Sequence, residues 1–162
     1  MKKGTIRPIP IVFLLNIITC GWYYLYWIYK TSSEIKDFTE REDLNPTLEL
    51  ILGIITCGLY FKYWYYKYGK IVYKEMPLKL GMNNTEDKTI ILVIIDILVA
   101  VIYYFNIIIS VLFLLLTLGE NAINEEDLIT MSGLIPTGLI FIVNISSLIM
   151  QDKLNNIWKH IQ

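Results

Sequence analysis

Residues 17–30 of the chain read IITCGWYYLYWIYK, and residues 54–67 read IITCGLYFKYWYYK. Each copy begins with apolar residues, passes through Thr-Cys-Gly, and ends with tyrosine and tryptophan residues followed by lysine. The second copy lies where no N-terminal signal sequence can be, so the shared cysteine is not the lipid-modified cysteine of a lipoprotein signal. The doubled phrase therefore predicts two related structural units.

Long stretches of the chain carry almost no charge. The protein has 162 residues, of which 55% are hydrophobic, and a formal net charge of −1. A helix needs about 20 apolar residues to cross about 30 Å of hydrocarbon. Four windows are of this length, and a soluble domain has no use for them because its helices need a polar face. The windows cover residues 8–29, 47–66, 89–118 and 128–150.

These windows predict an all-α fold. The expected architecture is a polytopic membrane helical bundle with four hydrophobic segments, located in the cell membrane. We expect one membrane domain over residues 1–162, because this length suits a single domain. Short amphipathic helices on the cytoplasmic side complete the prediction. The internal repeat covers residues 8–38 and 45–75, and a C-terminal helical pair covers residues 85–162.

Helix-boundary residues support these segments. Asn45 followed by Pro46 is typical of an N-cap and a first helical residue. Thr85 opens the third segment before two acidic residues, which stabilise a helix N-terminus. From Thr85 this helix has about 34 residues, or about 50 Å, so it must tilt, bend or project into water. Pro136 predicts a kink in the fourth segment.

Lysine and arginine residues indicate the orientation of the segments. Lysine and arginine occur at the N-terminus, in the connection 67–88 and at the C-terminus. The connection 119–127 contains acidic residues and no lysine or arginine. We therefore expect both termini in the cytoplasm and the connection 119–127 outside. The connection 30–44 contains both acidic and basic residues, so the orientation of the first two segments stays ambiguous.

Two layouts are open for the repeat. In the first, which we prefer at this point, all four segments span the membrane and the two copies run in opposite directions. In the second, each copy is a re-entrant hairpin that breaks near Thr-Cys-Gly and keeps all basic residues inside. Irregular backbone at that depth is tolerated only where protein or water covers it.

The residues shared by the two copies fall largely on one helix stripe at 3.6 residues per turn. Tryptophan, tyrosine and lysine at one end of a span are typical of an interfacial aromatic belt with a snorkelling lysine. The alternative is a pseudo-symmetric packing face, in which the glycines allow helices to approach closely. The matched residues are Gly21, Tyr23, Tyr26, Trp27 and Lys30 in the first copy, and Gly58, Tyr60, Tyr63, Trp64 and Lys67 in the second.

The pattern T-x-G-x-Y-x-x-Y-W-x-Y-K, present twice, resembles the prokaryotic membrane-protein family catalogued as domain of unknown function 4234. The resemblance covers residues 8–75 and a short ending that contains Gln151 and Asn155. This chain differs from the pattern by placing Lys62 inside the second copy. The resemblance implies a small polytopic protein and brings no established activity and no catalytic residue.

Lys62 and Asp96 are the most informative polar residues within the predicted spans. Each lies about 7 to 10 Å from the cytoplasmic end of its segment at 1.5 Å per residue, so both lie at a similar depth. An isolated charge there costs several kcal/mol. We expect a Lys62–Asp96 pair, or else a snorkelling lysine with Asp96 bonded to tyrosine hydroxyls. The other polar residues in the spans are Asn16, Glu49, Asn106 and Asn144.

Two connections are predicted to form surface helices. Residues 67–79 mix lysine with apolar residues, which is typical of a helix at the membrane interface. Lys70, Lys74 and Lys79 are the expected contacts with anionic headgroups, at about 1 kcal/mol each. Residues 31–43 are acidic and predict a plain exposed helix.

The sequence has no catalytic, metal or cofactor motif. Cys20 and Cys57 have no CxxC or Cys/His spacing, and the one histidine, His160, lies near the end of the chain. We expect no cofactor, no catalytic residue and no nucleic-acid partner. The leading hypothesis is a non-enzymatic bundle that acts through helix–helix, partner or lipid contacts, with homo-oligomers among the partners. A small transporter or channel component is the second hypothesis, and a membrane-embedded enzyme is the third.

Overall fold

The computed structural model describes residues 2–82, 86–119 and 144–161. Within these ranges the chain is helical and contains no β-strand. The helices, in chain order, are α1 (Ile9–Ile18), α2 (Trp22–Thr39), α3 (Pro46–Ile55), α4 (Tyr60–Lys70), the π-helix η1 (Ile71–Glu75), α5 (Met76–Lys79), α6 (Thr89–Gly119) and α8 (Ile145–Lys159). The predicted all-α class is confirmed for this part of the chain.

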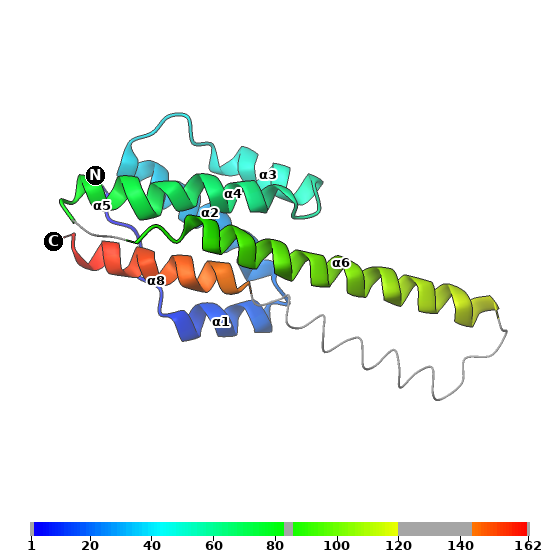
Figure 1. Cartoon of the computed structure of the whole chain (residues 1–162). Coiled ribbons are helices and arrows are strands. Elements are labelled where there is room, and N and C mark those ends of the chain that lie inside the picture. The colour runs from blue at the N-terminus through cyan, green and yellow to red at the C-terminus, as the bar shows by residue number, and fades with distance from the viewer. Residues whose placement is uncertain (1, 83–85, 120–143, 162) are drawn as a thin grey trace.

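The two copies of the repeated phrase form helical hairpins. α1 and α2 form the first hairpin and α3 and α4 form the second; in Figure 1 both turns point toward the end of the bundle from which α6 projects. The windows 8–29 and 47–66 are therefore not continuous helices. The four-span layout needs continuous helices there, so its description of these two windows is wrong. The break near Thr-Cys-Gly that the alternative layout requires is present.

The backbone at each turn explains why the helices break. Cys20 and Gly21 have φ angles of 48° and 86°, and Cys57 and Gly58 have φ angles of 50° and 87°. These left-handed conformations do not continue a right-handed helix, and glycine adopts them without steric cost. The glycine amide then donates to the carbonyl five residues earlier, at 2.8 Å in both copies. This bond closes the C-terminus of the preceding helix as in a Schellman motif.

A threonine joins the two helices of each hairpin. Thr19 Oγ1 donates to the carbonyl of Leu15 at 2.7 Å and accepts from the amide of Tyr23 at 2.9 Å. Thr56 Oγ1 makes the same two bonds, at 2.7 Å and 3.0 Å. One hydroxyl thus adds a second bond to a carbonyl in the last turn of one helix and satisfies a free amide at the start of the next.

α6 is the longest helix. It has 31 residues, which correspond to about 46 Å at 1.5 Å per residue. Its segment Thr89–Leu112 is the one helix in the described ranges that is long and apolar enough to cross a membrane. This agrees with the third predicted segment, although the helix begins at Thr89 and not at Thr85. Asp87 Oδ1 accepts from the Thr89 amide at 3.0 Å and caps the start of the helix.

The fourth predicted segment, 128–150, lies mostly outside the described residues, and so does the kink predicted at Pro136. Its end is described. Asn144 is the N-cap of α8, and its side chain accepts from the Ser147 amide at 3.0 Å. α8 then continues to Lys159, beyond the predicted end of the segment. A helix boundary therefore falls inside the predicted segment, and Asn144 is a capping residue and not a polar residue within one uninterrupted helix.

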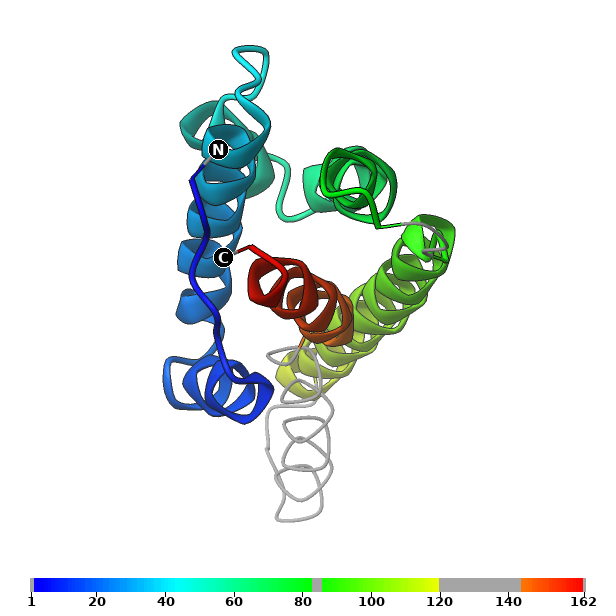
Figure 2. The same cartoon turned by 90° about the vertical axis from the view of Figure 1, so that its left-hand side faces the viewer.

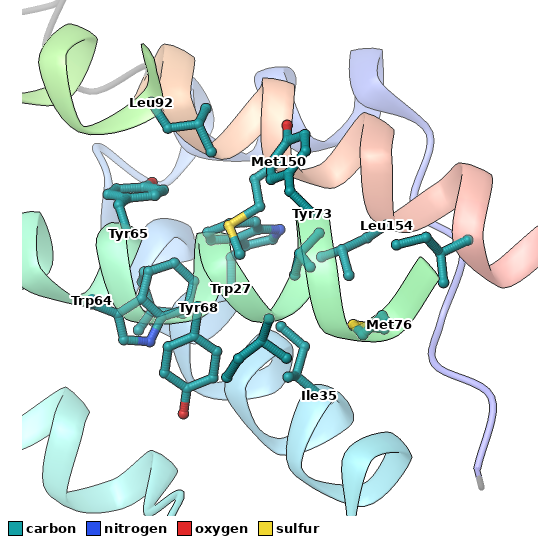
Figure 3. Packing of buried hydrophobic residues seen from close by; sticks show 14 of the residues in the cluster. Trp27, Ile35, Trp64, Tyr65, Tyr68, Tyr73, Met76, Leu92, Met150 and Leu154 are labelled. Atoms are coloured by element: carbon teal, nitrogen blue, oxygen red, sulfur yellow. The ribbon is translucent and has the colours of Figure 1, made fainter. Parts of the chain in front are cut away.

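The core lies between α2, α4 and α8. Figure 2 shows α8, in red, enclosed by the other helices at the end of the bundle that carries both termini. Figure 3 shows side chains from the three helices meeting in this space, and all of those named next are fully buried. They are Trp27 and Ile35 of α2, Trp64 and Tyr68 of α4, and Met150 and Leu154 of α8.

Both predicted surface helices belong to this core. Residues 31–43 include the second half of α2, where Ile35 and Phe38 are fully buried. Residues 67–79 form the end of α4, η1 and α5, where Met76 is fully buried. The predictions of a plain exposed helix and of an interfacial helix are wrong in this respect. Apolar side chains on one helix face gain about 25 cal/mol per Å² when a neighbouring helix covers them.

Candidate functional site

The tryptophans of the two motifs pack against each other. Trp27 and Trp64 are fully buried, and their rings meet edge to face with centroids 5.8 Å apart. Tyr24 and Phe61, which occupy equivalent positions in the two copies, also meet edge to face, at 5.5 Å. Each residue thus contacts its own counterpart, as at an interface with two-fold symmetry. The packing-face interpretation of the motif applies to these positions.

One tyrosine of each motif lies on the outside. Tyr26 and Tyr63 are 50% and 55% exposed. Each lies beside the tyrosine three residues earlier, Tyr23 or Tyr60, with 5.7 Å between ring centroids. Outward tyrosines of this kind are what an interfacial aromatic belt requires. The motif is therefore divided between core tryptophans and outward tyrosines.

The lysines that end the two motifs have different surroundings. Lys67 Nζ lies 2.8 Å from Glu49 Oε1, and the Glu49 side chain is 4% exposed. A buried carboxylate is costly unless it is paired, and Lys67 supplies the opposite charge. Lys30, the counterpart of Lys67, is exposed, and the counterpart of Glu49 is Val12.

The C-terminal residues Gln151 and Asn155 form a hydrogen-bonded chain with the tryptophan of the first copy. Trp27 Nε1 donates to Gln151 Oε1 at 2.6 Å, and Gln151 Nε2 donates to Asn155 Oδ1 at 2.9 Å. In the second copy Trp64 Nε1 donates to Ser32 Oγ at 2.8 Å. Both buried indole N–H groups therefore have the acceptor that buried polar groups require.

Arg7 fastens the N-terminal segment to the same network. Its backbone amide donates to Asn155 Oδ1 at 2.9 Å, and its carbonyl accepts from Asn155 Nδ2 at 2.7 Å. Its guanidinium donates to both carboxylate oxygens of Glu34, at 3.0 Å and 2.5 Å. Bidentate, charge-assisted bonds of this type are among the strongest that side chains make. Sequence reasoning missed Arg7 and Glu34 because it counted both only as charges of connecting segments.

Lys62 of α4 and Asp96 of α6 form an ion pair, with 2.5 Å between Lys62 Nζ and Asp96 Oδ2. The Asp96 side chain is 2% exposed and the Lys62 side chain is 24% exposed. The contact does not have the angles of a hydrogen bond, so charge attraction holds it. The structure thus brings together the two residues that the sequence analysis paired.

Asn144 connects Asp96 to two tyrosines. Asn144 Nδ2 donates to Asp96 Oδ1 at 2.8 Å, and Asn144 Oδ1 accepts from the Tyr65 hydroxyl at 2.9 Å. The Tyr24 hydroxyl donates in turn to the Tyr65 oxygen at 3.2 Å. The network joins α2, α4, α6 and the start of α8. Within an apolar bundle, such linked polar groups satisfy one another and orient the helices that carry them.

A cavity of about 430 Å³ opens beside this network. Lys62, Asp96 and Asn144 form its polar wall, and the two hairpin turns with apolar and aromatic side chains form the rest. The other lining residues are Cys20, Gly21, Trp22, Tyr24, Leu25, Cys57, Gly58, Val99, Ala100, Tyr103 and Tyr104. The Tyr104 hydroxyl donates to the Cys57 carbonyl at 2.8 Å and holds the second turn against α6. Because sites for small molecules typically measure about 300–1,000 Å³, this cavity is the candidate functional site.

Three of the four other predicted polar residues, Glu49, Asn16 and Asn106, lie outside the cavity wall. Asn16 is buried in α1, and its Nδ2 donates to the carbonyl of Val12 at 2.9 Å. Asn106 makes the same local bond on α6, to the carbonyl of Ile102 at 2.9 Å. A side-chain amide that bonds within its own helix in this way competes for the helix carbonyl four residues earlier. Neither asparagine is brought to Lys62.

The three lysines expected at anionic headgroups have partners within the chain. The partners are the Tyr66 hydroxyl for Lys70, Asp87 for Lys74 at 3.0 Å, and the Thr39 carbonyl for Lys79 at 2.8 Å. These contacts hold the ammonium groups near the surface of the bundle. Their contact with anionic lipid stays a prediction.

Two groups near these lysines have shifted pKa values. Hydrogen bonding from Thr89, followed by the Lys74 ammonium, lowers the pKa of Asp87 to about 2. Burial raises the pKa of Tyr73 in η1 to about 12. At neutral pH Asp87 is therefore ionised and Tyr73 is neutral.

The cavity wall combines one charged pair with apolar and aromatic groups. Among the described residues, no group of three or more His, Cys, Asp or Glu side chains is placed to hold a metal ion. Cys20 and Cys57 are free and exposed on the cavity wall. The cavity offers one neutral ion pair, an asparagine amide and an extended apolar and aromatic surface.

Comparison with known proteins finds one family. Residues 7–74 match the family described as Domain of unknown function (DUF4234). This range begins at Arg7 and contains both hairpins, and the match confirms the resemblance based on the doubled motif. Neither the curated proteins nor the solved structures gave a match to the chain.

Proposed function

We propose that this chain is a multi-pass integral membrane protein that acts without catalysis, by binding lipid or a protein partner within the bilayer. In this proposal α1–α2 and α3–α4 are re-entrant hairpins whose turns enter one leaflet, and α6 crosses the bilayer. The fourth predicted segment, 128–150, lies mostly outside the described residues, and a return crossing there stays a prediction. Both termini lie on the cytoplasmic side, where anionic headgroups contact the basic end of the bundle.

The exposure of large apolar side chains at the hairpin turns is the observation that carries this proposal. Ile18 and Trp22 flank the first turn and are 70% and 74% exposed, and Ile55 and Leu59 flank the second turn at 72% and 58%. Both turns lie toward the end from which α6 projects (Figure 1). Most of the large exposed side chains of α6 are apolar too. Soluble monomers rarely expose apolar patches of more than a few hundred Å². Acyl chains would cover all of this surface.

The lengths of the hairpins fit one leaflet. α1 and α3 have 10 residues each, so each is about 15 Å long at 1.5 Å per residue. This length is half of the hydrocarbon thickness of about 30 Å. The threonine hydroxyls and glycine amides bond within the turns. These bonds meet the requirement that irregular backbone inside a membrane has partners.

The opposite end of the bundle supports the placement of both termini on one side. Lys3 Nζ donates to the carbonyl of Ile161 at 2.7 Å, so the N-terminal and C-terminal segments are in contact. Figure 1 places α5 and the connection between α2 and α3 toward the same end. The segments at this end carry Lys2, Lys3, Lys79 and Lys159, and the connection between α2 and α3 adds both acidic and basic residues. Basic residues concentrate on the cytoplasmic side of membrane proteins.

Thiol labelling in intact cells tests the layout. Glu42 lies exposed in the connection between the hairpins, and Glu42→Cys is made in a chain with Cys20→Ser and Cys57→Ser. The hairpin layout expects no reaction with a membrane-impermeant maleimide until the cells are permeabilised. Glu125→Cys, in the connection predicted to lie outside, is the matched control and should react in intact cells. Labelling of Glu42→Cys from outside would overturn the hairpin layout.

A second candidate function, a transporter or channel component, is favoured by the position of the charged pair. Lys62 and Asp96 both line the cavity, and intramembrane charged groups often mark the path of a substrate or proton. The 2% exposure of Asp96 favours a closed structural pair instead. Flux of cations or protons into vesicles that contain the purified chain, abolished by Asp96→Asn, would favour transport over binding.

A further inference from the structure

We propose that the cavity beside Lys62 and Asp96 binds an uncharged amphiphile whose head group accepts hydrogen bonds, of the diacylglycerol class. This inference rests on the proposed membrane placement and adds the chemistry of the ligand. Three properties of the cavity carry it: the polar group that faces inward, the net charge of the wall, and the apolar surface next to the opening.

The polar group presented to a ligand is the Lys62 ammonium. Lys62 keeps 24% of its side chain exposed, whereas Asp96 keeps 2%. Both oxygens of Asp96 are engaged, Oδ1 by Asn144 and Oδ2 by Lys62. An ammonium carries three N–H donors, so Lys62 can donate to a ligand oxygen while it keeps its contact with Asp96. The ligand therefore needs an acceptor, such as an ester carbonyl or a hydroxyl oxygen.

The wall of the cavity is electrically neutral. Lys62 and Asp96 carry opposite charges, and the other lining residues that the structure describes carry no formal charge at neutral pH. A phosphate or carboxylate ligand would leave a net negative charge in an apolar site, and an amine ligand would leave a net positive one. Either uncompensated charge is unfavourable in a site of low polarity. An uncharged head group avoids this cost and so is favoured over both.

The rest of the wall matches hydrocarbon. Leu25 of α2 and Val99 and Ala100 of α6 line the cavity, together with the rings of Trp22 and Tyr103. The methylene groups of a ligand that arrives from the acyl chains can exchange their contacts with lipid for close contacts with this surface. A volume of about 430 Å³ holds a glycerol head group and the first part of its chains, while the remainder of the chains stays in the leaflet.

Both hairpin turns line the cavity, and their cysteines, Cys20 and Cys57, are exposed. In the proposed placement these turns are inside the leaflet, so a lipid-soluble ligand reaches the cavity laterally from the acyl chains. The two residues are also the only cysteines of the chain. Their thiols are therefore native reporters of whether the cavity is occupied.

The test measures how fast N-ethylmaleimide modifies Cys20 and Cys57 in the full-length chain in phosphatidylcholine nanodiscs. The probes are dioctanoylglycerol, which is uncharged, and dioctanoylphosphatidic acid, which has the same chains and a phosphate. We expect dioctanoylglycerol to slow both reactions about threefold at about twice its dissociation constant, by mass action. Dioctanoylphosphatidic acid at the same concentration should leave both rates unchanged.

Two matched variants separate the cavity from the surrounding lipid surface. Ala100→Trp fills the cavity, whereas Leu98→Trp adds the same side chain at a 57% exposed position of α6 outside its lining. Protection by dioctanoylglycerol should disappear in Ala100→Trp and persist in Leu98→Trp.

A third variant tests the polar wall. Lys62→Met combined with Asp96→Leu keeps the wall neutral and removes the donor. We expect it to raise the dioctanoylglycerol concentration for half protection about fivefold, the effect of losing one hydrogen bond worth about 1 kcal/mol.

Three results would overturn the inference: no protection by dioctanoylglycerol, equal protection by dioctanoylphosphatidic acid, or protection that survives Ala100→Trp. The labelling of Glu42→Cys reports the membrane layout separately. A chain that has the hairpin layout but unprotected thiols would keep the proposed function and lose this ligand.

Discussion

The first hairpin, α1–α2, and the second hairpin, α3–α4, have the same turn and different partners. In both, a threonine hydroxyl caps two helices, cysteine and glycine are left-handed, and the tryptophan is fully buried. The second hairpin has polar groups at several positions where the first is apolar, and three of these groups make the polar contacts described above. These are Glu49 for Val12, Lys62 for Leu25 and Tyr65 for Ile28.

The three replacements supply polar contacts that the first hairpin lacks at the equivalent positions. Lys62 and Tyr65 contact the Asp96–Asn144 pair, and Glu49 pairs with Lys67. Their counterparts in the first hairpin lie among apolar neighbours, and two of them are fully buried. The residues that the copies share therefore determine the backbone of a hairpin, and the residues that differ determine its chemistry.

Truncation of the paired tryptophans should have the largest effect, and a similar one in each hairpin. Trp27→Ala or Trp64→Ala removes a fully buried indole that contacts the other, and it leaves a cavity and an acceptor without its donor. We expect a loss of about 3–5 kcal/mol in the free energy of unfolding, measured by unfolding in mixed SDS micelles. Tyr26→Ala and Tyr63→Ala, at exposed positions, are the controls, with changes below about 1 kcal/mol. A loss at only one tryptophan would show that the hairpins contribute unequally to the core.

Loss of the charged pair should affect the second hairpin alone. Lys62→Met leaves Asp96 buried without its counter-charge; because Lys62 is partly exposed, we expect about 2–3 kcal/mol, below the cost for fully buried pairs. Leu25→Met, at the equivalent position of the first hairpin, should change stability by less than about 1.5 kcal/mol. The same micelle titration measures both. Addition of Asp96→Asn should restore most of the loss, and a double variant as unstable as Lys62→Met would contradict the pairing.

Alanine at the turn glycines tests whether the two turns are equivalent. Gly21→Ala and Gly58→Ala place a side chain at φ angles of 86° and 87°, which costs about 1–2 kcal/mol. A Cβ at Gly58 meets no atom closer than 4.0 Å, so backbone strain is the whole effect at that turn. Micelle unfolding should therefore give similar losses for the two variants, and unequal losses would mean that packing distinguishes the turns.

The preceding cysteines provide the control for this strain. Cys20→Gly and Cys57→Gly relieve φ angles of 48° and 50°. The relief is offset by the greater backbone entropy of glycine in the unfolded chain, so we expect a net change within about 0.5 kcal/mol. A large loss in either variant would show that the thiol itself packs against the bundle.

The smallest expected effect concerns the ion pairs beyond the hairpins. Lys74, which follows the second hairpin, lies 3.0 Å from Asp87, while the equivalent position of the first is Asp37, 3.7 Å from Lys2. The pKa of Asp87 is lowered to about 2, so its contribution to stability is complete above about pH 5 and is lost as the pH falls from about 4 to about 2.

Asp87→Asn should flatten this part of the acid unfolding curve, because the group that gains a proton is absent. The measurement is the midpoint of micelle unfolding as a function of pH. Glu86→Gln removes a neighbouring carboxylate that is 84% exposed and should keep the slope of the original chain. An unchanged slope in Asp87→Asn would contradict the role of this pair.

Local features of the sequence predicted much of this fold. Asn45 was expected as an N-cap, and its side chain accepts from the Leu48 amide at 3.2 Å at the start of α3. α6 lies where the third apolar window placed it. Capping and apolar length are properties of neighbouring residues, and such signals can be read without a fold. The same applies to the expectation that Lys62, in an apolar window, needs an opposite charge at its own depth.

The break in each hairpin was harder to predict, because hydropathy continues through Thr-Cys-Gly without interruption. Apolar length measures whether a segment suits a membrane, and it does not report the sign of φ at Cys20 or Cys57. The same limitation of apolar length explains why Asn144 is predicted within a span although it caps a helix. Its polar side chain caps a helix that begins inside an apolar window.

By itself, the sequence determined the helical class, the repeated motif and the residues that needed a polar partner. These features depend on groups a few positions apart. Only the tertiary structure decided the partners. Trp27 and Gln151 are 124 positions apart, and nothing local pairs Arg7 with Asn155. A buried donor bonds to the acceptor that the packing of the helices places about 3 Å away, and that packing is a property of the whole bundle.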